Sequence, residues 1–263
     1  DWGSIRMPSR EVYEKSLKKG YRVNLNPFEK YDSLESEEDL MFLFETLSKF
    51  KDINGFHPQI TANSLVANPD IDKIKDSNNT EYHFETVDKT FASYPKHSNS
   101  LNLWYEGEEK RVFHLQYHGR EHINNAMFMN ALKNKKEEAF WILENRMGGS
   151  ITKNGDNKNN YVAASNFSSR KELSEGINNI KEGLQIYKKL HKKESESYIA
   201  TNNIWPEEFE EILSKEGVKY LQGGYAQKMP KLGMSKQKTI FHYLGEKNDY
   251  NQIYLVRNVI FEP

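Results

Sequence analysis

Short apolar strands alternate with amphipathic helices along the whole chain, and this alternation most constrains the fold. Apolar runs and period-two patterns predict strands at 57–66, 112–117, 161–166, 197–205, 218–222, 239–244 and 253–261. Helical spacing and capping residues predict helices at 10–19, 36–47, 123–147 (with a weak break at 133–136), 170–192 and 206–217. Residues 21–34, 70–80, 104–111 and 225–238 are predicted as loops, with room for a short helix in 70–80.

This order indicates a mainly parallel sheet flanked by helices, either open or closed into a barrel. No linker or internal repeat divides the 263 residues, so we expect a single domain. In parallel α/β folds the functional site lies at the carboxyl ends of the strands. Polar side chains recur at such ends, in 1–4, 61–68, 118–122, 201–205, at Asn166 and at 257–258.

Composition excludes several classes of function. The 37 basic and 38 acidic residues nearly cancel, which argues against nucleic acid or an anionic membrane as a partner. No apolar run approaches the ~18 residues of a transmembrane helix. The absence of cysteine excludes disulfides, thiolate catalysis and cysteine metal sites. The aromatic residues can supply a core for this polar chain, and the oligomeric state stays open.

The sequence begins at Asp1 with no signal peptide, which leaves the compartment open and favours the cytoplasm. A chain that begins in this way is either processed or trimmed. We also expect further strands beyond Pro263, because a strong predicted strand ends immediately before it.

The histidines between residues 113 and 124 carry the sharpest chemical signal. Residues 113–117 alternate like a strand, with His114 and His118 on one side. His118 and His122 are four residues apart, so one turn of the helix expected there would bring both imidazoles together. Neutral imidazole is the commonest metal ligand in proteins, and two at this spacing can hold one ion. His114 would lie about 13 Å from His118 along a strand and is predicted to pack in the sheet. Surface or loop positions are predicted for His57, His83, His97 and His191.

The N-terminal Asp1-Trp2-Gly3 together with His118-x-x-x-His122 at a strand end resembles the polysaccharide deacetylase superfamily. The segments DWGSIRMPS, TANSLVANPD, HGREHIN and RNVIFEP are similar to a divergent bacterial branch of it and cover nearly the full chain. The resemblance implies a distorted or incomplete (β/α) barrel over residues 1–263. It implies a hydrolase that removes acetyl groups from a saccharide with one divalent ion, zinc being the first candidate. Asp1, His118 and His122 would be the metal ligands.

The resemblance extends to catalytic residues. Members of the superfamily have two consecutive aspartates, a general base and a ligand, of which Asp1 is the one visible; we expect the base just upstream. Glu121 either acts in the site by orienting a ligand or pairs with Arg120. Arg257 either orients an acid of the site or forms a structural ion pair. His242 is the one late histidine, but its apolar surroundings differ from those of the family's general acid.

Four residues are candidates for substrate binding. Segment 197–205 is similar to the substrate-groove motif of the family. Trp2 and Trp205 either stack on a sugar or pack in the core. Asn63 and Asn203 either bind substrate or shape the backbone.

Other functions stay open. One is a carbohydrate-binding barrel without catalysis, and another is a metal-independent glycoside hydrolase using a carboxylate pair such as Glu121 with Glu262. Residues 118–122 also fit H-x-x-E-H, the inverted zinc-protease motif. That motif belongs inside a helix, whereas Gly119 and the alternating run before it indicate that His118 ends a strand.

Overall fold

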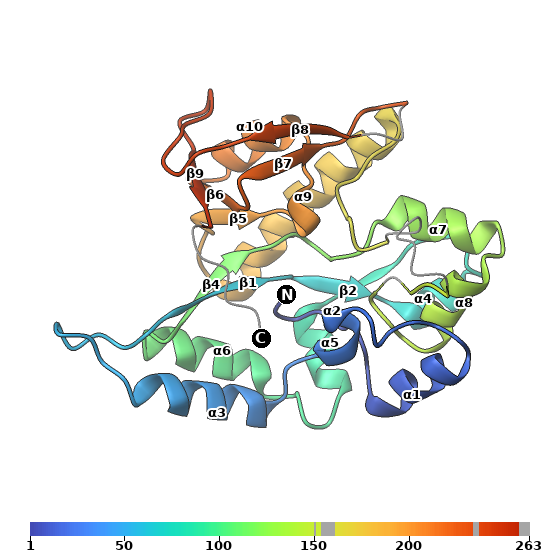
Figure 1. The fold of residues 1–263 in the computed structure, drawn as a ribbon, viewed down its shortest axis with the longest axis horizontal. Coiled ribbons are helices and arrows are strands. Elements are labelled where there is room, and N and C mark those ends of the chain that lie inside the picture. The colour runs from blue at the N-terminus through green and yellow to red at the C-terminus, as the bar shows by residue number, and fades with distance from the viewer. Residues whose placement is uncertain (150, 154–160, 234–236, 258–263) are drawn as a thin grey trace.

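A computed structural model describes the chain except for residues 150, 154–160, 234–236 and 258–263. Its main sheet contains five parallel strands, in the spatial order β1 (Ile60–Ser64), β4 (Phe113–Tyr117), β5 (Ser197–Ile199), β6 (Tyr220–Gly223) and β9 (Ile253–Val256). The order in space follows the order in sequence and never reverses. Doubly wound sheets reverse their order, whereas strands around a (β/α) barrel follow one another in sequence. The protein is therefore an α/β single domain with a parallel sheet; no closed barrel is seen among the described residues (Figure 1).

Helices and two small antiparallel sheets surround the main sheet (Figure 1). The helices are α1 (Arg10–Lys18), α2 (Pro27–Tyr31), α3 (Glu37–Ser48), α4 (Ile71–Asp76), α5 (Val87–Ser93), α6 (Ser100–Glu109), α7 (Asn125–Lys133), α8 (Glu137–Glu144), α9 (Arg170–His191) and α10 (Glu208–Lys215), with a 3-10 turn η1 (Thr201–Asn203). The small sheets pair β2 (Ala67–Pro69) with β3 (Phe84–Thr86), and β7 (Ala226–Met229) with β8 (Lys238–Phe241).

Strand β4 shows how helices cover the sheet. Phe113 is fully buried, and its ring centroid lies 6.3 Å from that of Trp104 on α6. The hydroxyl of Tyr187 on α9 donates to a backbone carbonyl of the same strand at 2.8 Å. Helices α6 and α9 thus cover the side of β4 that carries Phe113. Because side chains alternate along a strand, His114 and the following His118 belong to the opposite side.

Most predicted elements are present, but most strands are shorter than predicted. The predicted helix at 123–147 is two helices, α7 and α8, separated at the expected break. The predicted strand at 253–261 contains β9, and its residues 258–261 lie outside the described part of the chain.

Four predictions of secondary structure are wrong. The loop expected at 21–34 contains the helix α2. The loop expected at 104–111 is largely the end of α6, where Leu103, Trp104 and Gly107 are buried at helical spacing. The strand expected at 161–166 is a series of turns, buried like a strand but held by a side chain: the amide of Asn124 donates to the carbonyls of Ala163 and Asn166. The loop expected at 225–238 contains β7.

Among the described residues, no helix is both long enough and apolar enough to cross a membrane. The core consists of three clusters of buried apolar side chains. One involves α1, α7 and α8, a second involves α9, α10 and β6, and a third involves α3, α6 and β4. These clusters leave the carboxyl edge of the main sheet to the polar residues described next.

Candidate functional site

His118 and His122 lie on a loop that follows β4. The helical turn expected between them is wrong, because α7 begins only at Asn125. Gly119 has a φ of +120°, which glycine adopts without strain, and it turns the backbone immediately after His118. The two imidazole rings still meet, with centroids 5.1 Å apart. Their proximity is therefore a product of this loop and not of helical spacing.

Backbone hydrogen bonds fix the loop at both ends. The N–H of His118 donates to the carbonyl of Ser64 at 2.9 Å, which extends the pairing of β1 with β4 by one residue. The carbonyl of Arg120 accepts from the N–H groups of residues 66 and 67 at 3.2 and 2.8 Å. Asn124 then caps α7 with its side chain. The loop is an ordered extension of the sheet.

Asp1 reaches the histidines because the first residues pair with β1. The N–H of Trp2 donates to the carbonyl of Asn63 at 3.2 Å, and the carbonyl of Trp2 accepts from the N–H of Leu65 at 3.0 Å. Trp2 also forms a parallel bridge with Ser64, at the carboxyl end of β1. The segment that carries Asp1 therefore lies beside β1 as a further strand would.

Gly3 fixes the direction of this segment. Its N–H donates to both carboxylate oxygens of the buried Glu35, at 3.0 and 3.2 Å. Its carbonyl accepts from the amide of Asn68 at 2.8 Å. Burial raises the pKa of Glu35 to about 7. Gly3 has a φ of +80°, and a Cβ atom there would lie 2.9 Å from Val87 and 3.1 Å from Trp104. A larger residue would adopt an unfavourable φ and would require the side chains of Val87 and Trp104 to shift.

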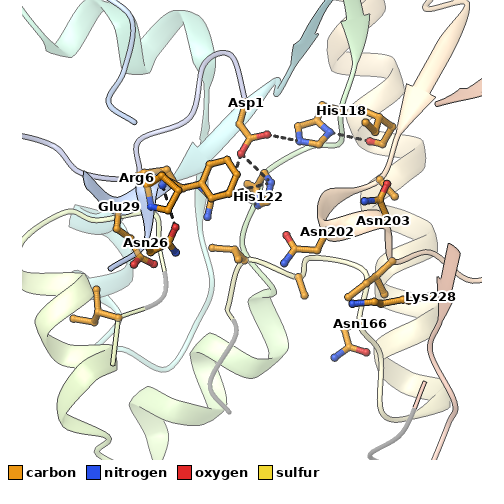
Figure 2. Close-up of a pocket in the computed structure, with 18 of the residues that line it drawn as sticks. Asp1, Arg6, Asn26, Glu29, His118, His122, Asn166, Asn202, Asn203 and Lys228 are labelled. Carbon is orange, nitrogen blue, oxygen red and sulfur yellow. Dashed lines mark hydrogen bonds and ion pairs between the residues drawn. The ribbon is translucent and has the colours of Figure 1, made fainter. Parts of the chain in front are cut away.

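Asp1, His118 and His122 together form a possible metal-binding triad (Figure 2). Oδ1 of Asp1 lies 3.0 Å from Nε2 of His118, and Oδ2 lies 3.2 Å from Nε2 of His122. One ligand atom from each residue lies within 4.8 Å of the others. Ligands about 2.1 Å from a tetrahedral ion are about 3.4 Å from one another. The spacing of the three groups thus fits a single divalent ion.

The hydrogen bonds of His118 favour a cation between the ring and Asp1. Nδ1 of His118 lies 2.8 Å from the carbonyl of Ile199, so Nδ1 carries the proton and donates it there. Burial lowers the pKa of His118 to about 3, and the ring is neutral near pH 7. Nε2 then presents a lone pair to a carboxylate oxygen, and two acceptors face each other. A metal ion between them relieves this repulsion, and a backbone carbonyl on the other nitrogen is the usual partner of a metal-bound imidazole.

His122 has the same protonation state. Burial lowers its pKa well below the ordinary value, so its ring is also neutral near pH 7. Metal binding requires neutral imidazole and ionised carboxylate. The triad holds both imidazoles in the form that a metal requires.

Arg6 lies directly against the triad. Its Nη2 donates to Oδ2 of Asp1 at 2.8 Å and lies 3.3 Å from Nε2 of His122. The side chain is buried, and its Nε has no hydrogen-bond partner among the described residues. Arg6 therefore holds the carboxylate of Asp1 in place and keeps one buried N–H unpaired beside the triad.

The triad forms part of the wall of a cavity of about 880 Å³. Figure 2 shows Asp1 and the two histidines at one end, Arg6 and Glu29 on one side, and Asn166 and Lys228 on the other. Side-chain amides are frequent in the lining: Asn26, Asn166, Asn202, Asn203 and Gln237. The charged side chains of the described lining, beyond the triad, are Arg6, Arg22, Glu29, Lys228 and Arg257.

The cavity brings together five of the nine site residues predicted from the sequence: Asp1, His118, His122, Asn203 and Arg257. Asn203 belongs to η1, directly after β5, and Arg257 directly follows β9. Each lies at the carboxyl end of a parallel strand, as the topology predicts. Segments far apart in sequence thus converge on one edge of the sheet.

Glu121 lies outside this group. One of its carboxylate oxygens accepts from Nε of Arg120 at 2.5 Å, and the other accepts from Nη2 of Arg120 at 2.7 Å and from the amide of Asn125 at 2.8 Å. The side chain is buried and does not line the cavity of the triad. The arrangement is the alternative ion pair with Arg120.

Trp2, Trp205 and Asn63 are also absent from the described lining of the cavity. Trp2 packs edge-on against Phe113, with ring centroids 4.8 Å apart. Trp205 is buried and donates from its indole nitrogen to Glu210 at 3.1 Å. Asn63 lies on β1, where its carbonyl receives the N–H of Trp2. Both tryptophans therefore pack in the protein interior.

Two other histidines are buried away from the triad. His242 is buried and stacks on Tyr254 with ring centroids 3.6 Å apart, while its Nε2 lies 2.7 Å from Gln227. His191 is buried at the end of α9 and not at the surface, so its predicted position is wrong. Asn258 and Glu262 lie outside the described residues.

The sequence did not single out Arg6, Glu29 or Lys228, all of which line the cavity. Burial raises the pKa of Glu29 to about 7, and perturbed carboxyl groups of this kind are frequent in functional sites. Arg6 lies in the motif DWGSIRMPS, which provides one signal for it. Nothing in the local sequence marks the other two, because only the fold brings α2 and β7 to the same cavity.

No family model matches the chain, and no curated protein or solved structure is significantly similar to it.

Proposed function

We propose that this protein is a metal-dependent hydrolase that removes acetyl groups from a saccharide. The observation that carries the proposal is the convergence of Asp1, His118 and His122 at a large cavity. Three protein ligands leave positions open on an ion, as in catalytic zinc sites. The resemblance of the same three residues to polysaccharide deacetylases supplies the class of reaction, which is an argument by analogy. Zinc is the first candidate, and other divalent ions suit the same ligands.

The fold supports the same proposal. The main sheet keeps one strand order, and the segment with Asp1 adds to it beside β1. An incomplete (β/α) barrel has this arrangement, with its site at the carboxyl edge. The carboxyl ends of β4, β5 and β9 each contribute a residue to the cavity.

A divalent ion held by the triad would polarise an acyl carbonyl oxygen and lower the pKa of a water molecule. The protein's own groups prepare the site for this role. The carbonyl of Ile199 fixes the ring of His118 with Nε2 unprotonated. Arg6 orients Asp1 through the hydrogen bond from its Nη2 to Oδ2 of the carboxylate.

The amide side chains of the lining support a saccharide as the substrate. Oδ1 of Asn166 accepts from Gln237 at 2.9 Å, and Oδ1 of Asn203 accepts from the N–H of Gly224 at 3.1 Å. These bonds fix both amides and leave their NH₂ groups without a described partner. Amides both donate and accept, which suits the hydroxyl groups of a sugar.

Metal reconstitution tests the proposal. The protein is stripped with a chelator, reloaded with zinc, cobalt, manganese or nickel, and assayed for acetate release from N- and O-acetylated oligosaccharides. We expect about one ion per chain and acetate release only with metal. The variant His122→Ala should lose both properties, and Glu121→Gln should keep its metal.

Other results would contradict the proposal. Glycosidic cleavage by the metal-free protein would assign it to the glycoside hydrolases. Binding of metal and sugar without acetate release from any substrate would assign it a carbohydrate-binding role without catalysis.

A further inference from the structure

The charged groups of the cavity are unevenly balanced. Four cationic side chains line its described part, Arg6, Arg22, Lys228 and Arg257, against two carboxyl groups, Asp1 and Glu29. Arg6 and Asp1 form an ion pair at 2.8 Å and offset each other. Glu29 is half protonated near neutral pH, because burial raises its pKa to about 7. A divalent ion at the triad would add further positive charge.

Within the described part of the chain, the other three cations have no carboxylate partner. Among the described residues, no ion pair or side-chain hydrogen bond involves Arg22, Lys228 or Arg257. Elsewhere on the surface, lysine and arginine commonly pair, as Lys219 does with Glu196 at 2.8 Å. Charges of one sign that line a concave site raise the local concentration of ligands of the opposite sign.

Lys228 and Arg257 line the cavity together with Asn203. Lys228 lies on β7, where it forms a parallel bridge with Ile204 and its carbonyl accepts from the N–H of Trp205 at 3.2 Å. The N–H of Arg257 donates to the carbonyl of Gly223 at 3.0 Å. Gly224, which directly follows β6, donates its N–H to Oδ1 of Asn203 at 3.1 Å.

Two cations and an amide NH₂ group thus line the cavity from neighbouring segments of the chain. Figure 2 shows Asn203 and Lys228 on one side of the cavity, across from Arg6 and Glu29. A carboxylate or a sulfate accepts several hydrogen bonds and is recognised by such a set of donors. Lys228 and Arg257 are exposed, so their charges are accessible to an anionic ligand.

We infer that the substrate is an acidic saccharide, whose carboxylate or sulfate group binds Lys228, Arg257 and Asn203 while its acetyl group faces the triad. The inference rests on the proposed function for the identity of the reaction, but the anion subsite is a binding property and can be tested without turnover.

A matched set of ligands tests the subsite. We would use triacetylchitotriose, the same trimer with its primary alcohols oxidised to carboxylates, and the same trimer sulfated at those positions. Binding to the metal-free protein is measured by calorimetry at low and high salt. We expect the acidic trimers to bind about tenfold more tightly than the neutral one, with the difference reduced by salt. The trimer with the larger advantage identifies the anion as carboxylate or sulfate.

Charge-neutralising variants locate the subsite. Lys228→Gln and Arg257→Gln should each weaken binding of the acidic trimers about fivefold, and leave the neutral trimer unchanged. The matched control is Lys89→Gln, an exposed lysine on α5 that does not line the cavity. Equal binding of acidic and neutral trimers, or equal effects of all three variants, would overturn the inference.

Acetate release, measured on the same trimers with metal, separates this inference from the proposed function. Release without any preference for acidic trimers would retain the function and reject the subsite. Preferential binding of acidic trimers without release would retain the subsite and reject the function.

Discussion

His118 and His191 are both buried histidines, and burial lowers the pKa of each to about 3. His118 lies at a sheet edge, donates from Nδ1 to Ile199 and directs Nε2 at Asp1, on the wall of the large cavity. His191 lies at the end of α9 against aromatic rings, the nearest being Tyr187 at 4.4 Å between centroids. Both ring nitrogens of His191 lack a partner among the described residues.

The comparison shows that burial of a histidine does not by itself identify a metal ligand. A lowered pKa by itself identifies a desolvated imidazole. His191 satisfies that criterion, although no cluster of metal-ligand groups in the described part of the chain includes it. His118 differs because its Nδ1 donates to the carbonyl of Ile199 and its Nε2 points at Asp1. Ligand atoms of Asp1 and His122 both lie close to this Nε2. A candidate metal site is therefore defined by convergence of ligand atoms and not by a perturbed pKa.

The largest expected effect is on metal binding. His118→Ala should lower the affinity for zinc by more than ~100-fold, because loss of a ligand exceeds the usual effect of losing its supporting partner. Elemental analysis after dialysis and competition with a chromogenic chelator measure it. His114→Ala, on the strand that precedes His118 but outside the triad, and His191→Phe should retain the metal. Equal metal content in all three variants would contradict the distinction between the two histidines.

The next effect is on stability in acid. His191 has a lowered pKa, so between pH 6.5 and about 3 the unfolded chain binds a proton that the folded protein excludes. Stability is therefore lost as the pH falls below 6.5, by up to about 2 kcal/mol at pH 5 from this residue alone. His191→Phe should remove that part of the loss.

Urea unfolding of wild type and His191→Phe at pH 7 and pH 5 checks the sign and size. The difference between the two proteins isolates His191, because groups such as Glu35, with a raised pKa, act in the opposite direction and are common to both. Parallel pH profiles would show that His191 is not held neutral by the fold.

A smaller effect, on the free energy of unfolding, is expected from substitution of Gly3, where the segment that bears Asp1 turns. Gly3→Ala forces an unfavourable φ and a contact with Val87, whereas Gly20→Ala forces an equally positive φ with no atom nearby. Gly3→Ala should cost about 1 kcal/mol more than Gly20→Ala in unfolding free energy. It should also weaken zinc binding several-fold by displacing Asp1. Equal costs for both variants would show that Val87 and Trp104 accommodate the added methyl group.

The sequence predicted the parallel α/β architecture because periodicity is local. Apolar and polar residues alternate along 113–117, which predicts β4, and Ser169 is the N-cap residue that predicts the start of α9. The errors occurred where tertiary contacts replace local pattern. The apolar segment 161–166 imitates a strand but takes its hydrogen bonds from Asn124, a residue that no local window includes.

The candidate site was also predicted only in part from the sequence. The histidine pair was found from its spacing, but the expected reason was wrong, since the turn at Gly119 and not a helix joins the rings. Asp1 was assigned by resemblance. Arg6 and Lys228 were not singled out: Arg6 shares the motif DWGSIRMPS with Asp1, but nothing next to Lys228 in the sequence marks its place in the cavity lining.

The sequence alone determined which chemistry is available: imidazole and carboxylate ligands, no thiol, and strands whose carboxyl ends carry polar residues. Tertiary structure decided which of these groups meet. Parallel pairing of Trp2 with Ser64 and of β1 with β4 brings Asp1 within 3.0 Å of a histidine 117 positions away. The physical reason is that side-chain types are fixed residue by residue, whereas the distances among them depend on long-range strand register and on the loops that leave the sheet edge.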